Sequence, residues 1–352
     1  MSAKTITSEN PAGLDGFAFV EFTADDPKMM GDMFEKMGFV AAARHEGLDL
    51  TLYRQGTIHF IVNGGGDQAE AFRAAHGPSA NAMAFRVADA DKAFAIAVER
   101  GAEPVDTAGS AFPDAKAVAG IGGSLLYLVD GDPFAGWTDV EGWEERAARE
   151  GVGLEILDHL THNVNRGQMR VWSSFYGDVF GFEEQKYFNI QGQATGLFSQ
   201  AMIAPDGRIR IPLNESKDEN SQIEEYLREY NGEGIQHIAL TTENIYQTVE
   251  ALRDRGVKLQ DTIETYYDLV DKRVPGHGED LERLKKNRIL IDGDTGDEGI
   301  LLQIFTENTF GPIFFEIIQR KGNEGFGNGN FQALFESIEL DQIRRGVIKV
   351  DA

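Results

Sequence analysis

The chain has 352 residues, and its 58 acidic against 33 basic side chains give a formal net charge of −25 at pH 7. A chain this acidic is repelled by polyanions, which argues against nucleic acid and anionic membranes as partners. Its length is typical of about two domains, and apolar residues make up 41% of it, enough to build real cores. It contains no cysteine, which excludes disulfides, thiolate metal sites and cysteine nucleophiles.

Targeting and membrane signals are weak along the chain. No run approaches the roughly 18 consecutive apolar residues that a membrane helix needs. The N-terminal segment 1–13 lacks the apolar centre of a signal peptide. We therefore expect a soluble, cytoplasmic protein whose ends, residues 1–12 and 347–352, are loosely held.

Two weak repeats relate the first half of the chain to the second. One relates residues 14–16 (LDG) to residues 157–159 (LDH), at an offset of 143 residues. The other relates residues 84–87 (AFRV) and 99–102 (ERGA) to residues 238–241 (IALT) and 254–257 (DRGV), and its second pair has an offset of 155 residues. Internal similarity at a fixed offset indicates a duplicated architecture.

The predicted elements follow the same order in each unit. A short apolar strand comes first, as in residues 17–22 (FAFVEF) and 236–242 (QHIALTT). A helix that ends at a glycine follows, as in residues 26–39 and 245–256. Strand-like runs then complete the unit. Four such units predict an α+β fold of four similar modules, paired into two halves.

The break between the halves is expected near residues 131–152, which are rich in glycine, tryptophan and charge and show no alternating pattern. This divides the chain into residues 1–150 and residues 151–352. Near the end of the second half, Asn330 can cap a helix, and apolar residues then recur at helical spacing. We expect a terminal helix over residues 330–346, docked on the second half.

Two of the seven histidines have distinctive positions in this pattern. His159 and His237 lie in the first strands of the third and fourth modules, where the offsets place Gly16 and Ala82 in the first half. Glu316 lies in a late strand among large apolar residues, where a carboxylate is costly unless it is paired or binds a metal. Two histidines and a carboxylate suit a facial triad for non-haem Fe(II). The alternative is that both histidines are hydrogen-bonded strand residues and that Glu316 pairs with an arginine.

Other motifs favour structural interpretations. His162 lies three residues after His159, so strand alternation sends it to the opposite face. Residues 63–66 (NGGG) precede a helix but lack the lysine of a phosphate loop, and they indicate a turn. Residues 292–297 (DGDTGD) imitate a calcium loop without its final glutamate, and they indicate a hairpin turn.

Several short motifs follow one another through nearly the whole chain. In the first half they are residues 13–17 (GLDGF) and 52–56 (LYRQG). In the second half they are residues 158–159 (DH), 211–215 (IPLNE), 221–224 (SQIE), 234–239 (GIQHIA), 301–305 (LLQIF), 315–320 (FEIIQR), 325–327 (GFG) and 329–331 (GNF). Each motif is weak alone, but their order is specific. The chain resembles the bacterial 4-hydroxyphenylpyruvate dioxygenase family.

The resemblance implies a vicinal-oxygen-chelate fold, in which four βαβββ modules pair into two half-barrels. It implies a metal-free first half that serves as a scaffold or interface. It also implies a catalytic second half that holds Fe(II) with His159, His237 and Glu316 and is gated by its terminal helix. The substrates would be 4-hydroxyphenylpyruvate and O2, and the products homogentisate and CO2, a step of tyrosine catabolism. The family also suggests a homo-oligomer, either a dimer or a tetramer.

The resemblance further implies the residues of the substrate pocket. Asn214, Gln236, Gln303 and Phe331 match catalytic positions. The substrate-binding set combines polar positions with an aromatic wall that can sandwich a phenyl ring. Its members are Ser199, Pro212, Asn214, Gln222, Gln236, Gln303, Phe305, Phe314, Phe326 and Phe331. Gln236 adjoins His237, so alternation points it away from the metal unless a bulge re-aims it or its role is indirect.

Three alternatives stay open. A hydroxymandelate synthase uses the same substrate and iron, although Pro212, Asn214 and Phe331 follow the dioxygenase pattern. An extradiol ring-cleaving dioxygenase would share the fold and the triad, but the glutamine-rich pocket and the terminal aromatic helix argue against it. A metal-free binding protein on the same scaffold is disfavoured by the intact triad.

Overall fold

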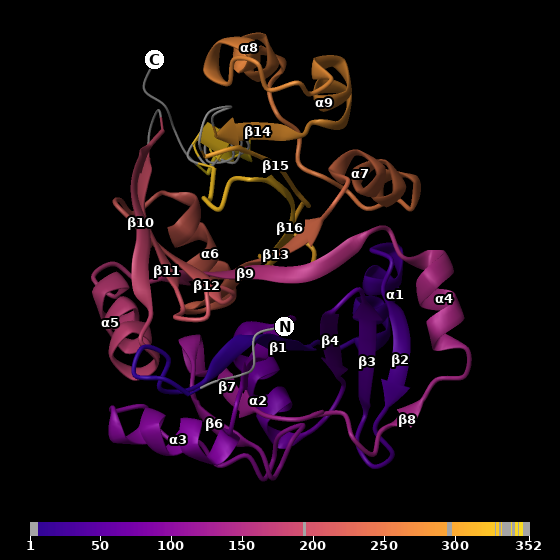
Figure 1. The fold of residues 1–352 in the computed structure, drawn as a ribbon, viewed down its shortest axis with the longest axis vertical. Coiled ribbons are helices and arrows are strands. Elements are labelled where there is room, and N and C mark those ends of the chain that lie inside the picture. Colours follow the sequence, from indigo (N-terminus) through magenta and orange to yellow (C-terminus); the bar gives the residue numbers. More distant parts are fainter. Residues whose placement is uncertain are drawn as a thin grey trace.

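The computed structural model describes residues 6–192, 195–293 and 298–327, and further residues 329, 330, 332, 339, 342, 343 and 345–347. These residues form two eight-stranded mixed sheets, one from each half of the chain (Figure 1). We name them the N-terminal sheet and the C-terminal sheet.

The N-terminal sheet and its helices occupy residues 14–150. In chain order the elements are β1 (Leu14–Thr23), α1 (Pro27–Lys36), β2 (Val40–Arg44), β3 (Leu50–Gln55), β4 (Ile58–Asn63), α2 (Asp67–His76), β5 (Ser79–Val87), α3 (Ala90–Glu99), β6 (Lys116–Ala119), β7 (Leu125–Val129), β8 (Thr138–Asp139) and α4 (Trp143–Glu150). The strands lie side by side in the order β6-β7-β5-β1-β4-β3-β2-β8.

The C-terminal sheet and its helices follow. In chain order they are β9 (Leu154–Val164), α5 (Met169–Phe180), β10 (Glu183–Gln191), β11 (Gly196–Ile203), β12 (Arg210–Ser216), α6 (Gln222–Tyr230), β13 (Gly234–Thr242), α7 (Ile245–Asp254), α8 (Val270–Arg273), α9 (Leu281–Asn287), β14 (Leu290–Gly293), β15 (Ile300–Phe305) and β16 (Phe314–Lys321). The strand order is β10-β11-β12-β9-β13-β16-β15-β14.

Each sheet is built from two modules that join through their first strands. β1 pairs antiparallel with β5, and β9 pairs antiparallel with β13. The last strand of each module returns parallel to its first strand. The predicted α+β fold of four paired modules is therefore confirmed. The other modules have three strands after the helix. In the second module, an isolated bridge between Pro104 and Val118 replaces the first of these three strands.

The strand register corrects one pairing that the repeat offset suggests. The offset matches His159 with Gly16. In the structure Ala239 pairs with His159, and its equivalent Ala84 pairs with Phe19. Phe19 is therefore the counterpart of His159. β1 contains register shifts before Phe19, and such bulges change the spacing along a strand without changing its partner.

The same register identifies counterparts of the other two candidate ligands. Ala82 corresponds to His237, as the offset predicts. Tyr127 corresponds to Glu316, because Tyr127 pairs with Ala84 and Glu316 pairs with its equivalent, Ala239. The duplicated fold thus places an aromatic ring, a methyl group and a phenol where the second half has its candidate ligands.

The two sheets share one hydrophobic core. Aromatic rings from both halves meet there, with centroids 5.4–6.3 Å apart, from Phe22, Phe34, Phe60, Phe310 and Phe315. Strand alternation explains how β16 serves both this core and the site, because Phe315 faces the shared core while Glu316 faces the opposite side of the sheet. The packing of the two halves therefore supports the strand that carries Glu316.

The segment between the sheets is more ordered than the sequence predicts. Residues 131–152 contain the two-residue strand β8 and the helix α4, none of whose side chains is buried. A strand this short and a helix this exposed leave no clear hydrophobic pattern. Gln55 ties the segment to the N-terminal sheet, because its Oε1 accepts the backbone N–H of Val152 at 2.6 Å.

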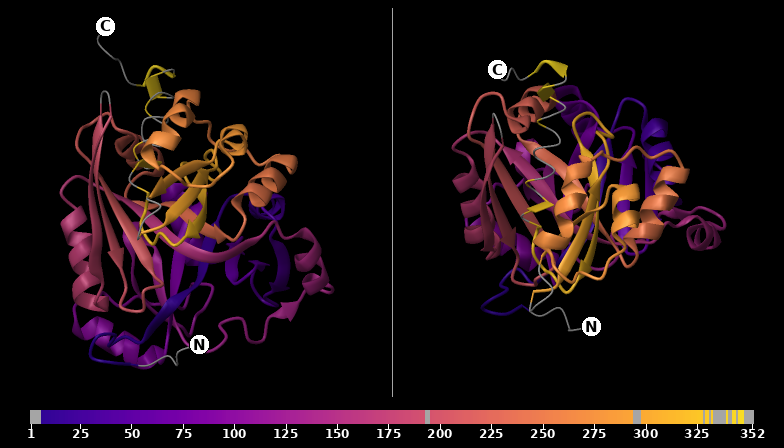
Figure 2. Two further views of the ribbon diagram at one scale, coloured as in Figure 1. Left: turned by 45° about the horizontal axis from the view of Figure 1, so that its top comes forward. Right: turned by 90° about the horizontal axis from the view of Figure 1, so that it is seen from above.

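The fourth module carries an insertion between α7 and β14 that contains α8 and α9. These helices lie at the end of the molecule away from the N-terminal sheet (Figure 2). The helix expected over residues 330–346 falls largely outside the described residues, although those that are described include helical Asn330 and Gln342. In the part of the chain that the structure describes, no helix is long and apolar enough to cross a membrane.

Candidate metal centre and substrate pocket

Three adjacent strands bring the candidate ligands together. β13 runs between β9 and β16, and Ala239 of β13 pairs with His159 on one side and Glu316 on the other. His237 lies two residues before Ala239, and residues two apart in a strand share a face. The methyl group of Ala239 leaves room for His159 and Glu316 to approach each other across the middle strand.

The ligand atoms converge on one point. Glu316 Oε2 lies 3.2 Å from His159 Nε2 and 3.4 Å from His237 Nε2. One donor atom from each residue lies within 4.8 Å of the other two. The residues are only 2%, 5% and 2% exposed, in the order His159, His237 and Glu316. Buried carboxylates and imidazoles that converge in this way are typical of metal sites.

The other ring nitrogens are already engaged. His159 Nδ1 donates to Asp158 Oδ2 at 2.8 Å, and His237 Nδ1 donates to Gln236 Oε1 at 3.0 Å. Both imidazoles therefore turn Nε2 toward Glu316, and Thr161 Oγ1 lies 2.9 Å from His237 Nε2. This donor set of two imidazole nitrogens and a carboxylate oxygen fits a first-row divalent metal.

Electrostatics keep Glu316 ionised. Burial alone would raise its pKa, but His159 and His237 outweigh that effect and lower the pKa to about 2. Burial likewise opposes a charge on His159, yet Glu316 and Asp158 together raise its pKa. Burial dominates at His237 and lowers its pKa. The site therefore presents an anion between two imidazoles of unequal basicity.

Comparisons with known proteins agree with this geometry. The family model described as Hydroxyphenylpyruvate dioxygenase, HPPD, N-terminal matches residues 8–137. The model of the Glyoxalase/Bleomycin resistance protein/Dioxygenase superfamily matches residues 156–269. A 4-hydroxyphenylpyruvate dioxygenase of Pseudomonas aeruginosa is 57% identical over 97% of this chain and 98% of its own length. One from Legionella pneumophila is 53% identical over 97% and 99%.

The chain belongs to the 4-hydroxyphenylpyruvate dioxygenase family. A solved structure of a 4-hydroxymandelate synthase mutant from Streptomyces coelicolor is also similar, with a TM-score of 0.80 and 27% identity over 94% of this chain and 99% of that chain. These similarities confirm the predicted vicinal-oxygen-chelate architecture.

One cavity adjoins the three candidate ligands, and it collects most of the pocket residues that the family resemblance implies. Its lining consists of His159, Thr161, Phe188, Ser199, Pro212, Asn214, His237, Gln303, Phe305, Glu316 and Phe326. Besides the three candidate ligands, polar side chains come from β9, β11, β12 and β15, and phenyl rings come from β10, β15 and the segment after β16. Such a mixture of aromatic walls and a few polar groups is typical of pockets for small aromatic acids.

Gln303 contacts a candidate ligand directly. Its Nε2 donates to Glu316 Oε1 at 2.6 Å, and its Oε1 accepts from Asn330 Nδ2 at 2.9 Å. Asn330 in turn accepts from the buried hydroxyl of Tyr266 at 2.8 Å. We call residues 330–352 the C-terminal segment. Its first residue, Asn330, is thus connected to Glu316 through one glutamine. Gln303 is therefore placed to orient the carboxylate as well as to face the cavity.

Three of the predicted pocket residues line a different groove. Gln222, Gln236 and Phe314 lie along a groove beside α6. Phe314 still contacts the centre, because its ring stacks on the ring of His237, with the ring centroids 4.9 Å apart and an interplanar angle of 20°. Gln236 lies at a register shift between Ile235 and His237. Its side chain reaches the centre through a hydrogen bond with His237 Nδ1, so its contact is indirect. Phe331 lies outside the described residues.

Two lining residues escape the sequence analysis. Thr161 follows His159 by two positions, so strand alternation could have found it. Phe188 pairs with Ser199 across β10 and β11, and only the strand register reveals that neighbour. His162, by contrast, faces away as predicted, and its Nε2 forms a hydrogen bond with the Tyr176 hydroxyl at 2.8 Å.

Proposed function

We propose that this protein is an Fe(II)-dependent 4-hydroxyphenylpyruvate dioxygenase that converts its substrate and O2 to homogentisate and CO2. The observation that carries the proposal is the buried convergence of His159, His237 and Glu316 in a chain 57% identical to a relative of that name over almost its whole length. The reaction balances without another reductant, because the keto acid supplies the electrons when it loses CO2.

Iron is the proposed metal because of the donor set. Two neutral imidazoles and one carboxylate leave a divalent ion with a net charge near +1 and with open positions, as in the facial triads of non-haem iron oxygenases. Bound Fe(II) would supply the positions where the keto acid and O2 meet and the electrons that start O2 reduction. The local positive charge would attract an anionic substrate despite the chain's overall charge of −25.

The protein's own contribution is to bind and orient the substrate. Phe305 and Phe326 stand on the cavity wall and offer faces or edges to the phenyl ring. Ser199, Asn214 and Gln303 supply the polar atoms of the same cavity, and we assign them to the keto acid and the phenol. Holding the ring and the keto acid in one orientation restricts where oxygen is delivered, which is how positioning selects one product.

The C-terminal segment is proposed to close this cavity and exclude water. Two of its described residues contact different elements of the C-terminal half. Thr195, before β11, donates its backbone N–H and hydroxyl to Glu339 Oε1 at 2.8 and 2.7 Å. Arg345 Nη1 pairs with Glu225 Oε1 of α6 at 2.8 Å. The N-terminal sheet is proposed to act as a metal-free scaffold and an interface between subunits.

Product analysis tests the proposal. Purified protein is loaded with Fe(II) without oxygen, mixed with 4-hydroxyphenylpyruvate and then exposed to O2, and the aromatic product is identified by mass and NMR. Homogentisate and one equivalent of CO2 are expected. Failure to turn over this substrate while Fe(II) is bound would overturn the proposed activity and leave the metal site standing.

The structural neighbour makes 4-hydroxymandelate synthase the second candidate. It would use the same substrate and metal but deliver oxygen to the benzylic carbon. Pro212 and Asn214 line the cavity as the dioxygenase pattern requires, and Phe331 completes that pattern in the sequence. Replacing Phe331→Ile should raise the share of benzylic product or of uncoupled decarboxylation. An unchanged product ratio would remove Phe331 from control of the reaction site.

A further inference from the structure

The two candidate histidine ligands have chemically different supports. His159 Nδ1 donates to the carboxylate of Asp158 at 2.8 Å, whereas His237 Nδ1 donates to the neutral amide of Gln236 at 3.0 Å. A carboxylate acceptor makes the opposite ring nitrogen a stronger donor than an amide acceptor does. The two imidazoles are therefore unequal before any metal binds.

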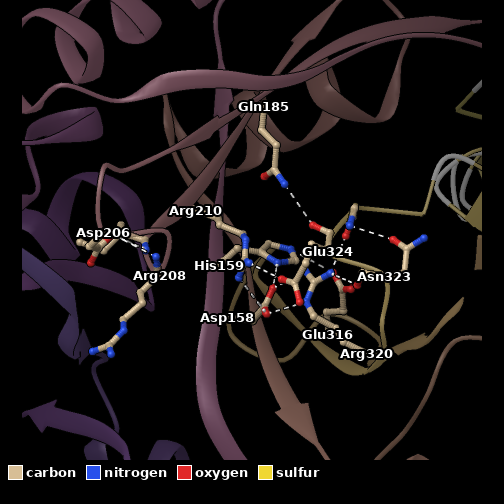
Figure 3. Close-up of polar contacts among 12 residues, drawn as sticks. Asp158, His159, Gln185, Asp206, Arg208, Arg210, Glu316, Arg320, Asn323 and Glu324 are labelled. Carbon is tan, nitrogen blue, oxygen red and sulfur yellow. Dashed lines mark hydrogen bonds and ion pairs between the residues drawn. The ribbon is translucent and has the colours of Figure 1, made fainter. Parts of the chain in front are cut away.

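Asp158 is itself tightly held. It is 3% exposed, and Arg320 grips it with two parallel bonds, Nε to Oδ1 at 2.9 Å and Nη2 to Oδ2 at 2.8 Å. Arg210 adds a longer contact to Oδ1 at 3.5 Å. Figure 3 shows Asp158 close to His159, Arg210 and Arg320, and the two arginines come from β12 and β16. A bidentate arginine fixes both the position and the plane of a carboxylate.

Arg320 also holds the pocket wall. Its Nη1 donates to the backbone carbonyls of Asn323 and Gly325, at 3.0 and 2.6 Å. The next residue, Phe326, places its ring 5.3 Å from the His159 ring and 6.0 Å from the Arg320 guanidinium. One guanidinium therefore connects the residue that orients His159 to the loop that carries an aromatic wall residue.

We propose that Asp158 and Arg320 are positioning residues for the metal centre. Asp158 holds His159 in the tautomer that leaves the Nε2 lone pair facing Glu316, and its charge strengthens that nitrogen as a ligand. Arg320 pairs with the buried carboxylate through two bonds and orients it, because an unpaired charge there would be costly. His159 is then the more strongly binding of the two histidines. This inference rests on the proposed metal function of the site.

A purely structural ion pair is the competing explanation. Many buried Asp–Arg pairs only join strands, and replacing such a pair by neutral groups is often nearly neutral for stability. The two explanations differ in what the metal experiences. A positioning pair changes metal affinity and the ligand field even when the fold is intact, whereas a structural pair changes only the unfolding transition.

Metal titration of three variants separates them. Asp158→Asn keeps the shape of the side chain and removes its charge, and Asp158→Asn combined with Arg320→Gln removes both charges so that none is left unpaired. The matched control is Asp15→Asn, because Asp15 also pairs with an arginine, Arg208, at 2.6 Å. Apo protein is titrated with Fe(II) without oxygen and, separately, with Co(II), whose visible d–d bands report the ligand field.

Both Asp158 variants should bind Fe(II) about 10- to 100-fold more weakly than the parent, with shifted Co(II) bands and an unchanged circular dichroism spectrum. Asp15→Asn should match the parent in affinity and bands. If the double variant folds, binds Fe(II) within about twofold of the parent and shows the parent's Co(II) bands, the positioning role is wrong. If the parent itself binds neither metal, the proposed metal function fails first, and the two failures are thus distinguishable.

Discussion

Each half of this protein joins two modules through their first strands, but the two interiors differ. In the C-terminal sheet, His159, His237 and Glu316 converge beside a cavity. In the N-terminal sheet, the position of His159 is taken by Phe19, whose ring lies 5.0 Å from Phe112, 5.7 Å from Tyr127 and 5.9 Å from Phe134. Duplication therefore supplied one architecture twice, and side chains at a few equivalent positions decided whether the interior became a reaction site or a packed core.

Each half also buries at least one carboxylate, and Glu21 in the first half and Glu316 in the second behave in opposite ways. Two imidazoles lower the pKa of Glu316 to about 2. Glu21 faces the amides of Asn63 and Asn81, at 2.7 and 2.6 Å, and burial raises its pKa because these neutral partners only partly compensate for lost water. Fold and burial are alike at the two sites, so the partners determine the charge state.

The largest contrast is expected on removing ligand side chains. Replacing His159, His237 or Glu316 by Ala should lower turnover on the order of a thousandfold or more, since a facial triad with two members no longer holds its metal in the reactive arrangement. Steady-state product formation and bound iron per chain measure this. The matched change in the other half is Tyr127→Phe, at the counterpart of Glu316, which should leave both quantities near those of the parent.

An unexpected result in either half would contradict this comparison. A ligand variant that retains full activity without iron would remove the triad from catalysis. Loss of iron from Tyr127→Phe would mean that the interior of the N-terminal sheet affects the metal centre, contrary to its proposed role as a scaffold.

A second contrast concerns the C-terminal segment, whose described contacts lie on the C-terminal half. Deleting residues 330–352 removes the Asn330 bond to Gln303 and the Glu339 bonds to Thr195. We expect a folded protein with turnover reduced at least about tenfold, because the cavity stays open to water. Thermal unfolding checks the fold, and homogentisate formation checks the activity. Unchanged homogentisate formation would show that this segment does not gate the reaction.

The sequence predicted the repeated modules and the three candidate ligands because these leave local signals. Glycine-ended helices mark the modules, and Glu316 stands out as a charge inside an apolar strand. The Gly16 counterpart was wrong, since bulges in β1 shift the register. Contacts between distant elements leave no such trace. No local sequence pattern indicates that Arg320 forms an ion pair with Asp158 or that Phe188 pairs with Ser199 across two strands.

The smallest predicted effect concerns stability rather than turnover, and it uses Glu21→Gln. Glu21 Oε1 accepts both amide bonds, so glutamine can keep them while losing the ionisable group. The folded-state pKa of Glu21 is raised, so above its unfolded value of 4.5 the native state binds more protons than the unfolded state. Parent stability therefore falls as pH rises from 4.5 toward the raised pKa.

The glutamine variant lacks this contribution. Relative to the parent, its free energy of unfolding should increase by about 1.4 kcal/mol per pH unit across that window and then level off. Urea unfolding of apo parent and variant at several pH values between 5 and 8 measures the difference. Glu316→Gln should differ from the parent with the opposite sign and at lower pH. The pKa of Glu316 is lowered to about 2 from 4.5, so its contribution to parent stability grows between about pH 2 and 4.5 and is constant from pH 5 to 8. Parallel stability curves for the parent and Glu21→Gln would mean that the carboxyl of Glu21 has an ordinary pKa, and the electrostatic contrast between the two halves would then rest on Glu316 alone.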